Sequence, residues 1–89
     1  MEYQELLKRI GLAVNSHDPI GLLGMGAPGD EYDAAITAIA VALRRCTSEE
    51  DCLARVWTIF RKAFDEAAGQ IDMYRPLVRD LMAIRWEKP

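Results

Sequence analysis

Two clusters of side chains in the first third of the sequence have the types and spacing that catalysis or metal binding requires. His17 lies next to Asp18, and a histidine beside a carboxylate can act as a general acid–base pair. Further along, Asp30, Glu31, Tyr32 and Asp33 place three carboxylates and a phenol within four residues. Carboxylates at this density can bind a divalent cation. A small metal-dependent enzyme using His17, Asp18, Asp30 and Asp33 is therefore one hypothesis.

The spacing within the acidic cluster favours helix capping over metal binding. Calcium-binding loops place their ligands at alternate positions and end with a glutamate, which this stretch does not. Asp30 suits an N-cap, and Asp33 then falls at the reciprocal position of a capping box. Tyr32 begins an apolar stripe that continues through the next helix. No nucleophile lies near His17 in the sequence to complete a catalytic group, so we expect no catalytic residue, metal ion or cofactor.

A glycine-rich stretch, GLLGMGAPG, separates the two clusters. Its glycines permit positive φ angles, but their spacing matches neither nucleotide-binding fingerprint and no strand precedes them. Asp18 followed by Pro19 predicts an N-cap and a first helical residue, which would open a short helical turn over Ile20–Leu23. We expect this apolar turn, which includes Gly21, to close one end of the fold.

Helical periodicity surrounds this stretch on both sides. Apolar residues at Tyr3, Leu7, Ile10 and Val14 step by four, three and four, as in an amphipathic helix. Ser48 predicts the N-cap of a later helix, with Asp51 at the capping-box position. The expected helices cover Glu2–Val14, Glu31–Arg45, Glu49 to about Ala68 with Gly69 as C-cap, and a last helix capped by Asp72 with Pro76 in its first turn.

The predicted fold is therefore all-α. It is a compact four-helix bundle in a single domain, residues 1–89, with one long structured glycine-rich loop between its first two helices. The net charge of −3 argues against a nucleic-acid partner. No apolar run approaches the length of a membrane span, and the acidic, amphipathic N-terminus does not resemble a signal peptide. We expect a cytoplasmic protein in which Cys46 and Cys52, whose spacing matches no zinc motif, are reduced thiols.

The combination of HDPIG at His17 to Gly21, DEYD at Asp30 to Asp33 and Ser-Glu-Glu at Ser48 to Glu50 resembles the YugE-like family of small bacterial proteins of unknown function. The resemblance extends over nearly the whole chain. It implies an all-helical fold but no reaction. Where members commonly have tryptophan before the first motif, this chain has His17. Some similar small acidic proteins resemble immunity proteins that are encoded beside bacterial toxins.

The leading functional hypothesis is a non-catalytic protein-interaction domain, specifically an immunity protein that binds and neutralises a toxin. Its acids would contact a basic surface on the toxin, and the candidate contacts are Asp30, Glu31, Asp33, Glu49, Glu50 and Asp51. A structural homodimer or adaptor is the main alternative. The alanine-rich second helix or the arginine side of the fourth would form its interface.

Overall fold

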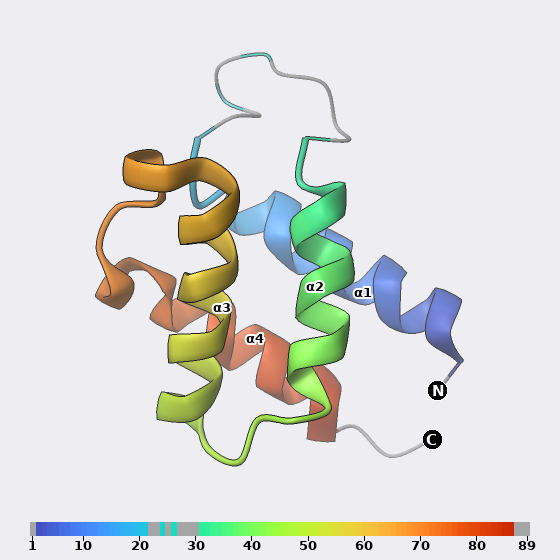
Figure 1. Ribbon diagram of the computed structural model, residues 1–89. Helices are drawn as coiled ribbons and strands as arrows, with labels where there is room; N and C mark the ends of the chain where they lie inside the picture. The colour runs from blue at the N-terminus through green and yellow to red at the C-terminus, as the bar shows by residue number, and fades with distance from the viewer. Residues whose placement is uncertain (1, 22–23, 25, 27–30, 87–89) are drawn as a thin grey trace.

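Four α-helices make up most of the chain that the structure, a computed structural model, describes (Figure 1). The described residues are 2–21, 24, 26 and 31–86. The helices are α1 (Tyr3–His17), α2 (Asp33–Leu43), α3 (Glu49–Phe64) and α4 (Arg75–Trp86), and two short 3₁₀ turns, η1 (Asp65–Ala68) and η2 (Ile71–Tyr74), join α3 to α4. No strand occurs among the described residues. The all-helical prediction, with four helices, is confirmed.

The helices form two layers (Figure 1). In that view α2 and α3 stand side by side in front, while α1 and α4 run crosswise behind them. The four helices contact one another in a closed ring: α1 packs on α2 and α4, and α3 packs on the same two helices. The Cα radius of gyration is 12.1 Å, which is about what a compact chain of this length has.

The first helix ends at His17, three residues later than predicted, and Asp18 terminates it. Asp18 adopts the left-handed conformation, with φ of 45°, and its amide donates to the Val14 carbonyl at 2.8 Å. The prediction that Asp18 is an N-cap was wrong, because it ends α1 and Pro19 prevents any further extension of that helix. A turn does begin at Asp18, whose carbonyl accepts from the Gly21 amide at 2.9 Å. The turn expected over residues 20–23 lies partly outside the described residues.

The second helix begins at Asp33, two residues later than predicted, and its N-cap residue Tyr32 makes no side-chain capping bond. Asp33 therefore occupies the first helical position instead of the third, and the expected capping box was wrong. Its carboxylate still lies in the first turn, where it favours the helix dipole. Asp30, the expected cap, lies outside the described residues. The predicted final residue, Arg45, lies in the turn after Leu43.

The third helix begins as predicted at Ser48, whose Oγ accepts from the Asp51 amide at 3.1 Å. It ends at Phe64, four residues before the predicted Ala68, because Asp65 turns the backbone with φ of 52° and the chain continues as a 3₁₀ turn. Gly69, with φ of 74°, ends that turn, as its expected C-cap role requires.

The fourth helix begins at Arg75, so Pro76 falls in its first turn, as predicted. The prediction that Asp72 caps this helix was wrong. Asp72 lies within the preceding 3₁₀ turn, and its carboxylate accepts from Arg75 Nε at 3.2 Å. The chain makes its 3₁₀ turn before the helix, which moves the helix start three residues beyond the expected cap.

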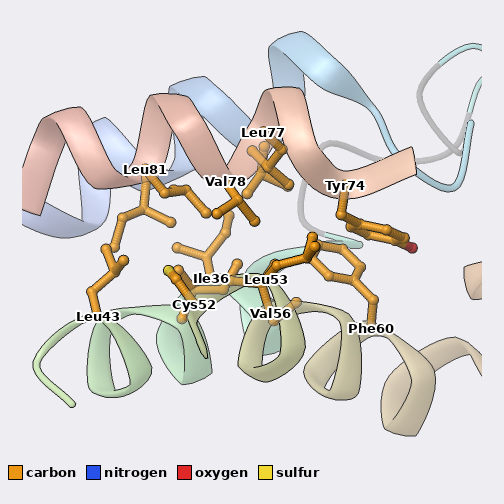
Figure 2. Close-up of a cluster of buried hydrophobic side chains, with 14 of the residues drawn as sticks. Ile36, Leu43, Cys52, Leu53, Val56, Phe60, Tyr74, Leu77, Val78 and Leu81 are labelled. Atoms are coloured by element: carbon orange, nitrogen blue, oxygen red, sulfur yellow. The ribbon is translucent and has the colours of Figure 1, made fainter. Parts of the chain in front are cut away.

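The core lies between the two layers and is richest in rings around Phe60 (Figure 2). Phe60 is fully buried, and its ring centroid lies 5.2 Å from that of Tyr74 and 6.0 Å from those of Tyr32 and Phe64. The buried Tyr74 hydroxyl donates to the Ala68 carbonyl at 2.6 Å, and burial raises the pKa of Tyr74 to about 12. Tyrosines fit here because each hydroxyl finds a partner inside the protein.

Candidate interaction surface

The residues of the first predicted chemical cluster serve the fold. His17 Nε2 lies 2.6 Å from Asp80 Oδ2 on α4, and this contact joins the end of α1 to another helix. The Asp18 carboxylate accepts from the Tyr32 hydroxyl at 2.7 Å and from the Gly24 amide at 3.0 Å. Its oxygens therefore hold the chain that follows α1. The acid–base pairing proposed for the two neighbours is replaced by these separate contacts.

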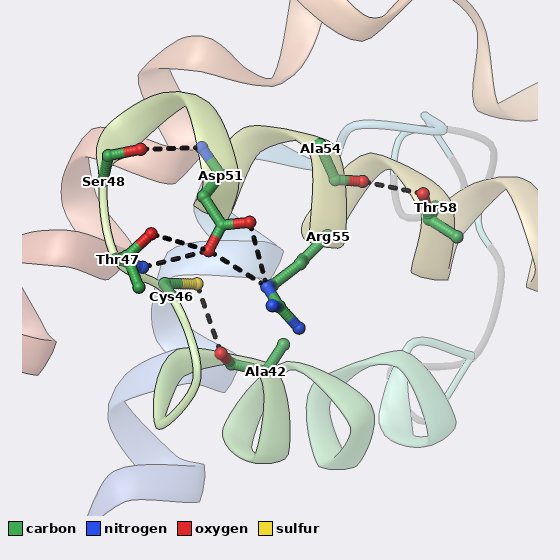
Figure 3. A network of polar contacts seen from close by, with 8 residues as sticks. All are labelled: Ala42, Cys46, Thr47, Ser48, Asp51, Ala54, Arg55 and Thr58. Atoms are coloured by element: carbon green, nitrogen blue, oxygen red, sulfur yellow. Dashed lines mark hydrogen bonds and ion pairs between the residues drawn. The ribbon is translucent and has the colours of Figure 1, made fainter.

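No group of three or more metal-ligating side chains occurs in the part of the chain that the structure describes. Cys46 and Cys52 are thiols and both are buried. Cys46 Sγ donates to the Ala42 carbonyl at 3.2 Å, so this thiol completes the C-terminal end of α2 (Figure 3).

The acids at the start of α3 contact arginines of the same chain. Arg75 lies 2.6 Å from Glu50 and 3.9 Å from Glu49, and Arg79 lies 3.5 Å from Glu49. The hydrogen bond from Arg75 lowers the pKa of Glu50, and the arginine charge adds to the effect. Glu49 and Glu50, which were expected to contact a partner, thus already form ion pairs with arginines of α4, although Glu50 remains largely exposed.

Asp51 is likewise bonded to groups of its own chain (Figure 3). Its carboxylate accepts from the Thr47 amide at 3.0 Å and from Arg55 Nε at 3.1 Å. The Thr47 amide, and next the Arg55 hydrogen bond, lower the pKa of Asp51. Of the six acids expected to contact a partner, Asp30 lies outside the described residues. Glu31 just before α2 and Asp33 at its first position are exposed.

The helix α2 is unusual because it is apolar on every side. Asp33 is its only charged residue. Its inner side chains are buried in the core: Ala35, Ile36, Ile39, Ala40, Ala42 and Leu43. Its outer face, defined here as Ala34, Thr37, Ala38 and Val41, is not buried, and Val41 is 51% exposed. The Thr37 hydroxyl donates back to the Asp33 carbonyl at 3.1 Å, which lowers the polarity of this face further.

A groove separates this outer face from α3. Its larger part encloses about 520 Å³ and its smaller part about 380 Å³, and the two parts share Ala38, Ile59 and Lys62. The remaining lining residues are Ala34, Ala35, Val41, Ala42, Arg45, Ala54, Arg55, Thr58 and Ala63. This α2–α3 groove therefore has an apolar floor and three cationic side chains.

A second groove lies on the opposite side of α2, against α1, and encloses about 470 Å³. Its polar lining residues are Gln4, Lys8, Asn15, Asp33 and Thr37, and they stand beside Leu7, Gly11, Leu12 and Ile36. Unlike the first groove, it is lined by charges of both signs. Leu12 at its edge is 64% exposed. The open apolar surface thus extends to both sides of α2.

Comparison of the chain with protein families, with curated proteins and with solved structures gave no match. Among the described residues, no helix combines the length and the apolar character needed to cross a bilayer.

Sequence reasoning placed the candidate contacts at the acids and missed the groove. The signal available in the sequence was the composition of α2, whose 11 residues carry a single charge, whereas α1 and α3 carry charges along one side. A helix without a polar face has to meet protein on all sides or leave apolar surface exposed. The cations of the groove, by contrast, come from distant positions, Arg45, Arg55 and Lys62, and their convergence needs the folded chain.

Proposed function

We propose that this protein is a non-catalytic interaction domain that presents the outer face of α2 to a partner protein. The observation that carries the proposal is the all-round apolar character of a helix that has one side open. Exposed apolar surface bordered by polar residues is typical of interaction sites, because covering it removes it from water. The grooves on either side of α2 extend the surface that a partner could cover.

The narrower form of the proposal is a bacterial immunity protein whose partner is a toxin. The resemblance of the HDPIG and DEYD motifs supports this form, and it adds no information about the contact surface. Glu49, Glu50 and Asp51 already contact arginines of this chain, so they are weak candidates for the contacts. Glu31 and Asp33, beside the open face, are better placed.

The test is a pair of matched arginine substitutions. Val41→Arg places a charge on the outer face of α2, whereas Ala83→Arg places the same charge at an exposed position on α4 that lines neither groove. A partner is first identified by affinity purification from the native host and then reconstituted with purified protein. We expect Val41→Arg to weaken binding by about tenfold or more, and Ala83→Arg to leave it unchanged.

Circular dichroism on both variants checks that each remains folded. A reconstituted partner that binds both variants equally well would show that the outer face of α2 is not the contact surface. For the immunity form, the matched measurement uses the product of the adjacent gene, and failure of that protein to bind the wild-type chain would exclude it.

A further inference from the structure

The charged residues that line the α2–α3 groove are all cations. They are Arg45, Arg55 and Lys62, and none of the described carboxylates lines it. The chain as a whole carries a net charge of −3, so this groove is electrostatically opposite to the rest of the molecule. Arg55 pairs with Asp51 at 3.1 Å, but within the described residues Arg45 and Lys62 make no ion pair. These two cations remain available to an acidic partner.

The apolar floor of the groove consists mainly of small side chains. Ala34, Ala38, Ala54 and Ala63 supply small side chains, so a partner backbone can approach closely. The Thr58 hydroxyl donates to the Ala54 carbonyl at 2.7 Å within its own helix, so a partner need not supply an acceptor for it. The 11 residues of α2 span about 16 Å, which matches roughly three turns of a helix lying alongside.

We propose that the α2–α3 groove binds an amphipathic α-helix of another protein, with apolar side chains on the alanine floor and glutamates or aspartates flanking them. The inference rests on the proposed function and specifies the chemistry of the partner. Recognition of this kind lays the apolar face of a helix into a groove, and charges at the groove edge select the partner and speed its association.

A second copy of the chain fits this groove less well. In a two-fold symmetric dimer the same patch faces itself, so Arg45 and Lys62 of one copy would approach the cations of the other. Like charges brought together across an interface cost binding free energy. The single carboxylate of α2, Asp33, lies in the α1–α2 groove on the other side and cannot compensate Arg45 and Lys62.

The experiment is a selection with displayed helical peptides of about 14 residues, which cover the length of the groove. Each peptide has a fixed stripe of leucine and alanine, and the flanking positions are randomised among Glu, Gln and Lys. We expect selection against the full chain to enrich glutamate at the flanks. The best peptide, made synthetically, should bind about tenfold more tightly than its counterpart with lysine at those positions, and the difference should shrink as salt is added.

Three charge-reversal variants locate the binding site. Lys62→Glu and Arg45→Glu should each weaken the selected acidic peptide by roughly three- to tenfold. Lys8→Glu, the matched control on the α1–α2 groove, should leave its affinity unchanged. Circular dichroism confirms that each variant is folded.

Enrichment of lysine, absence of any charge preference, absence of binders, or an equal effect of Lys8→Glu would overturn the proposal. So would a dimer, detected by sedimentation, that Val41→Arg dissociates, because a second copy would then occupy the groove. The proposed function fails separately, when the reconstituted partner is insensitive to Val41→Arg. A partner that needs Val41 but shows no preference for acidic helices would sustain the interaction domain and reject this groove chemistry.

Discussion

Among single residues, Tyr32 connects the two sequence motifs. Its ring is fully buried against Phe60, and its hydroxyl donates to Asp18 at 2.7 Å and accepts from the Ile20 amide at 3.2 Å. Asp18 and Ile20 belong to the HDPIG motif and Tyr32 to DEYD. The two motifs therefore contact each other directly, and this contact fixes the end of α1 relative to the start of α2.

Replacing Tyr32 by phenylalanine tests this connection. Tyr32→Phe keeps the ring but removes the hydroxyl, which leaves the Asp18 carboxylate and the Ile20 amide without that partner in a partly buried site. We expect the free energy of unfolding in urea to fall by about 1–3 kcal/mol. The control is Tyr3→Phe, since Tyr3 is 43% exposed on α1. Equal effects of the two substitutions would show that the buried hydroxyl stabilises nothing.

Among the elements, α3 has the best-defined start. Ser48 Oγ accepts from the Asp51 amide, and the Asp51 carboxylate turns back to the Thr47 amide, so two backbone donors at the helix start are satisfied (Figure 3). Arg55, one turn further on, pairs with the same carboxylate. These contacts are local, and they anchor the helix that carries one wall of the α2–α3 groove.

Removing the cap should destabilise the protein without altering its shape. Ser48→Ala eliminates the acceptor for the Asp51 amide, and we expect a loss of about 1 kcal/mol in the free energy of unfolding. Ser16→Ala serves as the control, because Ser16 lies exposed near the end of α1 and not at a helix start. If thermal and urea unfolding of the two variants coincide, the capping bond contributes nothing measurable.

For the whole molecule, stability depends on the few large side chains that join the layers. Phe60 on α3 contacts Tyr74 before α4 (Figure 2). It also contacts Tyr32 before α2, so one ring links three parts of the chain. A domain of this size is stable by only about 4–13 kcal/mol. The loss of one such ring is therefore a large fraction of the total.

Truncation of that ring should bring the protein close to unfolding. For Phe60→Ala we expect a loss of about 3–5 kcal/mol, from lost burial and from the cavity left behind. Phe64→Ala, at a partly buried position one turn further on, should cost clearly less. Thermal melts followed by circular dichroism measure both, and an equal shift in the two variants would contradict the central place of Phe60.

Sequence alone determined the features that neighbouring residues encode. The four helices follow from apolar periodicity, the start of α3 from Ser48, the end of η1 from Gly69, and the place of Pro76 from the first-turn rule. Each of these depends on side chains and backbone groups only a few residues apart. Local chemistry encodes such features, so they can be read without knowing the tertiary contacts.

Tertiary structure decided the rest, because the partners lie far apart in the chain. His17 and Asp80, 63 positions apart, meet only when α1 packs on α4. Glu50 meets Arg75 across 25 positions, which turned an expected partner contact into an internal ion pair. The α2–α3 groove likewise exists only once two helices lie side by side and bring Arg45 and Lys62 to its edges. The periodicity of a helix shows which of its faces is apolar, but only its neighbours in the folded chain determine which face stays open.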